Sequence, residues 1–421
     1  MAESVFSYKG SELFVEDVSL DQLAEELGTP LYVYSTKAIL DNLASYQKAF
    51  ADRPHLIAYS VKAASNLAIL SLVQKQGGGA DIVSGGELFR ALKAGIDPQK
   101  IVFSGVGKTK AEMAEALKAG ILSFNVESAP ELAALSQVAQ SLGLKAPIAF
   151  RVNPDVDPQT HPYVATGFRD SKFGVPVEEA LKLYKVAQED PNIEIVGLDC
   201  HIGSQLTSLG PFKATAERLL VLLGKIKALG LELKILDLGG GLGIDYYDQK
   251  DPDKIPPLTK DYARAFSAIY QAYPGLTIVL EPGRSVVGPA GVLLVTTLYD
   301  KITPFKRFFI TDGAMNDLIR PSLYGSYHNI KPVKDQGRPA ALVNVVGPVC
   351  ESGDFLAQDR ALPIVQPGER LAVFGAGAYG FSMASNYNSR ARSAEVLVNG
   401  ATFRIIRTRE TREDLIRGET L

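Results

Sequence analysis

The sequence has no tryptophan and only two cysteines, Cys200 and Cys350, among 421 residues. Two thiols cannot form a network of disulfides, so the fold is not expected to depend on cross-links. Reduced thiols are typical of cytoplasmic proteins, and we therefore predict a cytoplasmic location. We place Cys200 inside the strand that begins at residue 193 and interpret it as a small buried apolar residue.

Long apolar stretches and a large excess of charge of one sign are also missing. The first ten residues, MAESVFSYKG, lack the basic start and the apolar core of a secretory signal peptide. No stretch of about 18 apolar residues occurs, which predicts no membrane span. The net charge is -3, whereas a nucleic-acid-binding protein usually concentrates basic residues on one face. We therefore predict neither a membrane nor a nucleic-acid partner.

The first two thirds of the chain alternate between short β-branched runs and segments with helical spacing of apolar residues. The chain is long enough to expect two domains. Eight strand–helix units in about 250 residues match a TIM barrel, although an open doubly wound sheet shows the same alternation. The count of eight favours the barrel. The strand-like runs are 56–60, 80–84, 101–104, 121–125, 148–152, 193–199, 234–238 and 277–281.

After Arg284 the pattern changes to short strands separated by turn signals, which predicts a β domain. Residues 31–34 also have the composition of a strand, so the N-terminal segment is expected to join that domain. We predict a barrel domain of residues 36–285 and a β domain of residues 1–35 and 286–421. The strand-like runs of the second part are 291–297, 307–311, 341–346, 371–374, 395–398 and 402–406.

Chemically active residues gather where four barrel strands end, and TIM barrels carry their active sites at that end. Each motif alone has an ordinary explanation: a surface lysine, a structural histidine, a tight turn or a loop. Their common position favours a site. The motifs are Tyr59-Ser-Val-Lys62, His201-Ile-Gly-Ser-Gln205, Gly239-Gly-Gly-Leu-Gly243 and Glu281-Pro-Gly-Arg284.

The glycine cluster after the seventh strand suggests a phosphate site, because glycines let backbone N–H groups approach phosphate oxygens. A lysine, a histidine and a glutamate beside a phosphate site indicate pyridoxal phosphate. Lys62 would hold this cofactor as a Schiff base. Glu281 would pair with the pyridinium nitrogen. A dinucleotide-type motif at 375–380 has too few residues after it for a Rossmann unit, so nicotinamide binding is disfavoured.

Taken together, six motifs resemble the diaminopimelate decarboxylase family, and the resemblance covers nearly the whole chain. That family shares its fold, a TIM-like barrel with a C-terminal β domain, with ornithine decarboxylases and alanine racemases. The resemblance implies a homodimer with shared active sites, pyridoxal 5′-phosphate as cofactor and no metal. The motifs are 59–63, 201–205, 239–241, 281–284, 350–354 and 375–379.

The resemblance also implies a role for each motif. Lys62 resembles the Schiff-base lysine, His201 would stack on the cofactor ring, and Glu281 would meet the ring nitrogen. Cys350 would be the proton donor and would come from the neighbouring subunit. The other cofactor-binding residues implied are Ser204, Gly240, Gly241, Gly283, Arg284 and Tyr379.

The substrate implied is meso-2,6-diaminopimelate, which loses CO₂ to give L-lysine in the last step of lysine biosynthesis. Arg284, Arg320 and Tyr324 match positions that hold the distal carboxylate, and arginine suits a planar carboxylate. Glu351 matches the position that meets the distal amine, where ornithine decarboxylases typically carry an aspartate. Tyr379 is also expected to contact substrate.

Three alternatives stay open at this point. The chain could decarboxylate ornithine, arginine or carboxynorspermidine. An alanine racemase is disfavoured, because that family sets an arginine against the ring nitrogen. An inactive homologue that only binds a partner is disfavoured by the presence of Lys62, Glu281 and Cys350. Asp81 is expected near the ring and residues 161–174 near the mouth of the site, while Ala64 departs from the asparagine frequent in the family.

Overall fold

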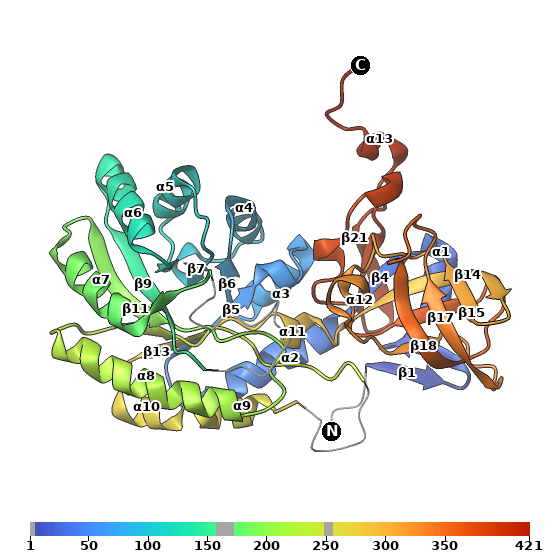
Figure 1. The fold of residues 1–421 in the computed structure, drawn as a ribbon, viewed down its shortest axis with the longest axis horizontal. Coiled ribbons are helices and arrows are strands. Elements are labelled where there is room, and N and C mark those ends of the chain that lie inside the picture. The colour runs from blue at the N-terminus through green and yellow to red at the C-terminus, as the bar shows by residue number, and fades with distance from the viewer. Residues whose placement is uncertain (1–4, 157–171, 248–255) are drawn as a thin grey trace. The chain divides into compact units, whose positions relative to one another are not determined.

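A computed structural model describes residues 5–156, 172–247 and 256–421 (Figure 1). Within these residues the chain forms two compact units. The barrel unit comprises Asn42–Ile244 and Asp253–Ser285, and the β unit comprises Met1–Asp41, Asp245–Pro252 and Val286–Leu421.

The barrel unit contains a closed ring of eight parallel strands. Neighbouring strands pair in parallel register around the ring, and β8 pairs with β9 to close it. This arrangement confirms the predicted TIM barrel over the open sheet. The strands in ring order are β5 (His55–Ser60), β6 (Gly79–Ile82), β7 (Ile101–Phe103), β8 (Ser123–Val126), β9 (Ala146–Asn153), β11 (Ile193–Asp199), β12 (Ile235–Asp237) and β13 (Thr277–Leu280). The short β10 (Val175–Pro176) pairs with β9.

Helices follow the strands and cover the outside of the ring (Figure 1). Local sequence explains where several begin and end. Thr109 and Glu112 form a capping box at the start of α5, and Gly120 ends this helix with a φ of 73°. The helices that lie entirely within the barrel unit are α3 (Leu67–Lys75), α4 (Gly85–Lys93), α5 (Lys110–Ala119), α6 (Ala129–Leu142), α7 (Val177–Glu189), α8 (Gly210–Ala228), α9 (Thr259–Ala265) and α10 (Ser267–Ala272).

The β unit is built on a nine-stranded sheet with the main order β18-β17-β15-β14-β4-β20-β21. Strand β4 (Leu31–Ser35) pairs antiparallel with β14 and parallel with β20, which confirms that the N-terminal segment joins this domain. The other strands are β14 (Gly291–Ile302), β15 (Arg307–Thr311), β16 (Ile330–Pro332), β17 (Ala340–Val346), β18 (Phe355–Pro363), β19 (Arg370–Val373), β20 (Ala394–Asn399) and β21 (Thr402–Arg407). A separate small sheet contains β1 (Phe6–Lys9), β2 (Glu12–Val15) and β3 (Val18–Ser19).

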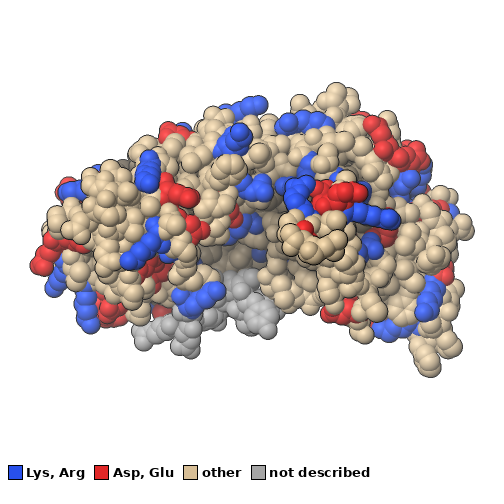
Figure 2. Space-filling model, turned by 90° about the horizontal axis from the view of Figure 1, so that it is seen from above, with Lys and Arg blue, Asp and Glu red and all other residues tan. Residues whose placement is uncertain are grey.

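The remaining helices are short or amphipathic. None of the helices within the described ranges has both the length and the apolar character that a membrane crossing requires. On the face that Figure 2 shows, basic and acidic side chains are interspersed. These helices are α1 (Leu20–Leu27), α2 (Thr36–Ala49), α11 (Arg284–Val287), α12 (Arg320–Tyr324) and α13 (Arg412–Leu415).

Candidate active site

Every strand of the barrel carries a polar side chain in it or directly after it. Because the eight strands are parallel, their carboxyl ends lie at the same end of the barrel. This end therefore collects acids, amides, hydroxyls and cations from the whole ring. The residues, in ring order, are Lys62, Asp81, Ser104, Asn125, Arg151, Asp199, Asp237 and Glu281.

Lys62 follows β5 in a single 3₁₀ turn, Val61–Ala63, and is paired with an acid on the neighbouring strand. Its Nζ donates to Asp81 Oδ2 over 2.6 Å, and the Ser60 hydroxyl donates to the same oxygen over 2.6 Å. The Asp81 side chain is fully buried, whereas 38% of the Lys62 side chain is exposed. The acid thus anchors the Lys62 amine, while part of the Lys62 side chain stays accessible.

Three further carboxyl groups lie together at the ends of β11, β12 and β13. Asp199, Asp237 and Glu281 are buried, and each offers an oxygen atom within 4.8 Å of the others. Ser104 Oγ donates to Glu281 Oε1 over 3.2 Å. Burial, followed by the charges of Asp237 and Asp81, raises the pKa of Glu281 well above its ordinary value. The Glu281 carboxyl therefore holds a proton readily.

This cluster predicts a pH-dependent stability of the cofactor-free protein. Burial also raises the pKa of Asp199 and Asp237 in the folded state. Carboxyls with a raised folded pKa bind more protons in the folded than in the unfolded protein, so stability falls as pH rises above 4.5, the ordinary pKa of glutamate. We expect a lower Tm at about pH 8 than at about pH 6, and a smaller difference in Glu281→Gln. Equal pH slopes for the two proteins in differential scanning calorimetry would contradict this assignment.

His201 follows β11 and lies against the glycine cluster. The Gly240 N–H donates to His201 Nδ1 over 3.1 Å, so the ring hydrogen sits on Nε2. Burial, with the positive charges of Arg151 and Lys62, lowers the pKa of His201 well below its ordinary value. The imidazole is therefore neutral, which suits stacking on an electron-poor ring.

The glycine cluster leaves room where side chains would clash. A Cβ at Gly239, whose φ is 63°, would lie 2.4 Å from His201 Nδ1, and a Cβ at Gly240 would lie 2.3 Å from the Glu281 carbonyl oxygen. The chain needs glycine here to bring the loop after β12 against the loops after β11 and β13. No side chain of this loop then stands between its backbone and a ligand, while the N–H groups of Gly239 and Gly240 donate to Asp237 Oδ1 and His201 Nδ1.

Replacing Gly240 by alanine is expected to weaken pyridoxal phosphate binding by about tenfold or more, because the methyl group must displace backbone. The measurement is a titration of the cofactor-free protein with pyridoxal phosphate, followed by absorbance. Gly224→Ala is a matched control, since its Cβ would meet only Tyr273 Oη, at 3.9 Å, and it lies within α8. Equal affinities of the two variants for pyridoxal phosphate would argue against cofactor binding by the glycine cluster.

Two of the residues predicted to bind the cofactor, Ser204 and Arg284, also contact each other. Arg284 Nε and Nη2 donate to Ser204 Oγ over 3.3 and 3.0 Å. A Cβ at Gly283 would lie 2.9 Å from both Ala63 Cβ and Ser60 Cβ, so the loop after β13 packs closely on the turn that carries Lys62. The barrel unit therefore brings together every site residue that the sequence placed in it.

These residues fit pyridoxal phosphate. The unit supplies a lysine, a neutral histidine, a buried carboxyl group and a glycine cradle at one end of the ring. Among the described residues, Asp199 Oδ1 and Asp81 Oδ1 are buried without a hydrogen-bond partner, which leaves acceptors for a ligand or for water.

The predicted residues of the β unit occupy loops and a short helix. Arg320 and Tyr324 begin and end α12. Cys350 is exposed, and its N–H donates to Asn388 Oδ1 over 2.9 Å. A hydrogen bond with the neighbouring Glu351 raises the pKa of Tyr387.

Tyr379 has a φ of 56° in the motif 375–380, an uncommon conformation for a residue with a side chain. Such backbone strain is often found at functional positions.

The sequence interpretation assigned no role to Ser104, Asn125, Arg151, Asp199 or Asp237. The available signal was a polar residue at the carboxyl end of an otherwise apolar strand. Asn125 Nδ2 donates to Ser104 Oγ over 3.1 Å and to Asp237 Oδ2 over 3.4 Å, which joins these residues to Glu281. Of the segment predicted near the site mouth, residues 161–171 lie outside the described residues.

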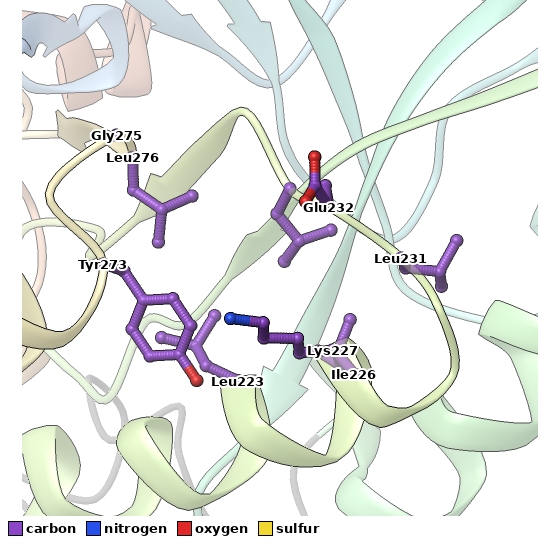
Figure 3. Close-up of a pocket in the computed structure, with 9 residues that line it drawn as sticks. Leu223, Ile226, Lys227, Leu231, Glu232, Tyr273, Gly275 and Leu276 are labelled. Carbon is purple, nitrogen blue, oxygen red and sulfur yellow. The ribbon is translucent and has the colours of Figure 1, made fainter.

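A cavity of about 300 Å³ lies at the opposite end of the barrel. It is bordered by the loops that lead into β12 and β13, and Figure 3 shows the Lys227 side chain extending toward Tyr273. None of the sequence-predicted residues lines it. The predicted site residues of the barrel unit therefore lie away from this cavity, at the carboxyl ends of the strands.

Comparison with known proteins agrees with this geometry. Residues 36–288 match the family described as "Pyridoxal-dependent decarboxylase, pyridoxal binding domain". The diaminopimelate decarboxylase of Pseudomonas aeruginosa is 50% identical over 416 residues, which cover 99% of this chain and 99% of that protein. The enzyme of that name from Aquifex aeolicus is 49% identical over 409 residues, which cover 97% and 96%.

Solved structures are similar over the same length. Diaminopimelate decarboxylase from Helicobacter pylori, complexed with L-lysine, has 44% identity and a TM-score of 0.90, with 94% of this chain and 98% of that chain covered. The M. jannaschii enzyme in complex with L-lysine has 40% identity and a TM-score of 0.94, with 99% and 98% covered. These matches confirm the predicted pyridoxal phosphate-dependent decarboxylase and its cofactor. The chain belongs to the diaminopimelate decarboxylase family.

Proposed function

We propose that this chain decarboxylates meso-2,6-diaminopimelate to L-lysine and CO₂, the last step of lysine biosynthesis, in the cytoplasm. The observation that carries the proposal is the Lys62–Asp81 ion pair, set beside the buried acids of β11 to β13. The similar proteins named above are diaminopimelate decarboxylases, and two of the solved ones hold L-lysine.

Bound pyridoxal phosphate supplies an electron sink for the electron pair that the departing CO₂ leaves on the α-carbon. In the proposal, Lys62 Nζ binds the cofactor and Asp81 keeps that amine in place. Glu281 keeps a proton at the ring nitrogen, and the neutral His201 imidazole stacks on the ring. The loops that contain Gly240, Gly241 and Gly283, with Ser204, Arg284 and Tyr379, hold the phosphate and the ring.

The reaction also needs a proton donor and residues that bind the distal carboxylate and amine of the substrate. The bond between the α-carbon and its carboxylate breaks, and the Cys350 thiol donates the proton that forms the new C–H bond. Arg320 and Tyr324, with Arg284, bind the distal carboxylate, while Glu351 meets the distal amine. Tyr379 also contacts the substrate. The domains proposed remain 36–285 for the barrel and 1–35 with 286–421 for the β domain.

The test is incubation of the pyridoxal phosphate-loaded protein with meso-diaminopimelate, with lysine and CO₂ both measured. Equal amounts of the two products are expected. Ornithine, arginine and carboxynorspermidine serve as competing substrates. Turnover of one of these alone would leave the cofactor assignment intact and overturn the substrate. A protein that takes up no cofactor would instead support the inactive homologue.

The homodimer with shared active sites is tested by mixing two inactive variants, Lys62→Ala and Cys350→Ala. If the two residues of one site come from different subunits, half of the sites in a mixed dimer are intact. Random exchange of subunits should then restore about a quarter of the wild-type activity. Mixtures that stay inactive, although subunit exchange is demonstrated, would contradict a site shared in this way.

A further inference from the structure

Arg320 is held by uncharged groups of its own unit. The side chain is buried at the first position of α12. Its Nη1 donates to Tyr246 Oη over 2.8 Å and to His328 Nε2 over 3.1 Å, and its Nη2 donates to Ser326 Oγ over 3.3 Å. Two hydroxyls and one imidazole thus orient the guanidinium, and none of the three neutralises its charge.

The contacts of His328 define its protonation state. The residue is fully buried, and its Nδ1 lies 2.8 Å from the carbonyl oxygen of Phe374. A carbonyl oxygen only accepts, so Nδ1 carries the hydrogen, and a guanidinium only donates, so Nε2 is the acceptor. The imidazole is the neutral Nδ1–H tautomer. A second proton would set two donors and two positive charges 3.1 Å apart.

The ring has little freedom to turn. Tyr246 packs edge-on against it, with ring centroids 5.1 Å apart and an interplanar angle of 72°. Arg360 Nη1 donates to the His328 carbonyl oxygen over 3.0 Å. A Cβ at Gly375 would lie 2.9 Å from Tyr246 Cδ1 and 3.8 Å from His328 Nδ1, so the first glycine of the motif 375–380 leaves space for this arrangement.

We propose that His328 is a positioning residue, which sets the orientation of the Arg320 guanidinium for a carboxylate of the substrate. This inference rests on the proposed function, in which Arg320 binds the distal carboxylate of diaminopimelate. A guanidinium and a carboxylate are both planar and bind best edge to edge, so the orientation of one decides how well it accepts the other. His328 thereby contributes to selection of a substrate that has a carboxylate at its far end.

Two amide variants separate the two hydrogen bonds of the imidazole. In glutamine the amide oxygen is attached to the δ-carbon and reaches the place of Nε2, so His328→Gln keeps an acceptor for Arg320. In asparagine the amide nitrogen is attached to the γ-carbon and reaches the place of Nδ1, so His328→Asn keeps only the donor to Phe374. The probes are L-lysine, which retains the distal carboxylate, and cadaverine, which has two amines and no carboxylate.

Inhibition constants of both probes are measured on the pyridoxal phosphate-loaded proteins, together with KM and kcat for meso-diaminopimelate. In His328→Asn we expect L-lysine to bind about 10- to 100-fold more weakly, with KM rising in parallel and kcat changing less than about threefold. Cadaverine should bind as in the wild type. His328→Gln should stay within about threefold of wild type for L-lysine.

Several outcomes would overturn the inference. Equal loss of L-lysine binding in both amide variants would mean that the imidazole only fills space. The variant Arg320→Gln distinguishes an error in the role of His328 from an error in the proposed function. If this variant binds L-lysine normally, the proposed role of Arg320 is wrong. If Arg320→Gln weakens L-lysine binding and His328→Asn does not, only the positioning role is wrong.

A measurement on the wild type covers the case in which His328→Asn does not fold. In histidine-labelled protein, ¹⁵N chemical shifts distinguish Nδ1–H from Nε2–H tautomers. The His328 signal is assigned by elimination, with variants of His55, His161 and His201. A neutral Nδ1–H signal is expected, and an Nε2–H or doubly protonated ring would refute the geometry on which the inference depends.

Discussion

Replacing Lys62 by alanine is expected to lower kcat/KM for meso-diaminopimelate by about 10⁴-fold or more, because the variant lacks the amine that we propose binds the cofactor covalently. The pyridoxal phosphate that remains bound should have the absorption spectrum of a free aldehyde. Steady-state kinetics and a visible spectrum of the same sample measure both effects.

Lys110→Ala is the control for this variant. Lys110 begins α5, is exposed, and its Nζ donates to Gln137 Oε1 over 2.9 Å. The same substitution there should leave kinetics and spectrum unchanged. A Lys62→Ala protein that keeps both the wild-type spectrum and more than about a tenth of the activity would show that another amine binds the cofactor.

Replacing Glu281 by glutamine is expected to lower kcat by about 10²- to 10³-fold while the cofactor stays bound. A neutral amide cannot favour the protonated ring nitrogen as a carboxylate does, so the ring becomes a weaker electron sink. At neutral pH the cofactor-free variant should be at least as stable as the wild type, because an amide can be buried without first taking up a proton, as the Glu281 carboxylate must on folding. Kinetics and thermal unfolding of the variant test both statements.

Glu115→Gln makes the same chemical change on the exposed side of α5 and should not affect kcat. Glu281→Asp restores the charge on a shorter side chain, and it should recover part of the lost rate. Unchanged kcat in Glu281→Gln would contradict the proposed contact between this residue and the ring nitrogen. Loss of cofactor from the variant would point to a role in binding and not in electron withdrawal.

The barrel could be predicted because each of its strands is indicated by a short local pattern of residues. All eight strands were found from apolar, β-branched runs, and segments with helical spacing were recognised between them. Strand β18 was missed because polar side chains interrupt its pattern: Gln358, Asp359 and Arg360 lie at its centre, with Gln358 and Asp359 exposed. A strand of this kind is stabilised by its pairing with β17, which no short window of sequence contains.

The sequence by itself determined the fold class and the family, and it proposed Lys62 and Glu281 as the central residues, because these inferences depend on motifs a few residues long in a characteristic order. The tertiary structure alone decided which other side chains act with them. Ser104 and Glu281 are 177 residues apart and meet because β7 and β13, which are not neighbouring strands, belong to one closed ring. In the same way, the tautomers of His201 and His328 are set by Gly240 and Phe374, partners that lie 39 and 46 residues away. Such contacts depend on chain closure and burial, which a local pattern of residue types does not specify.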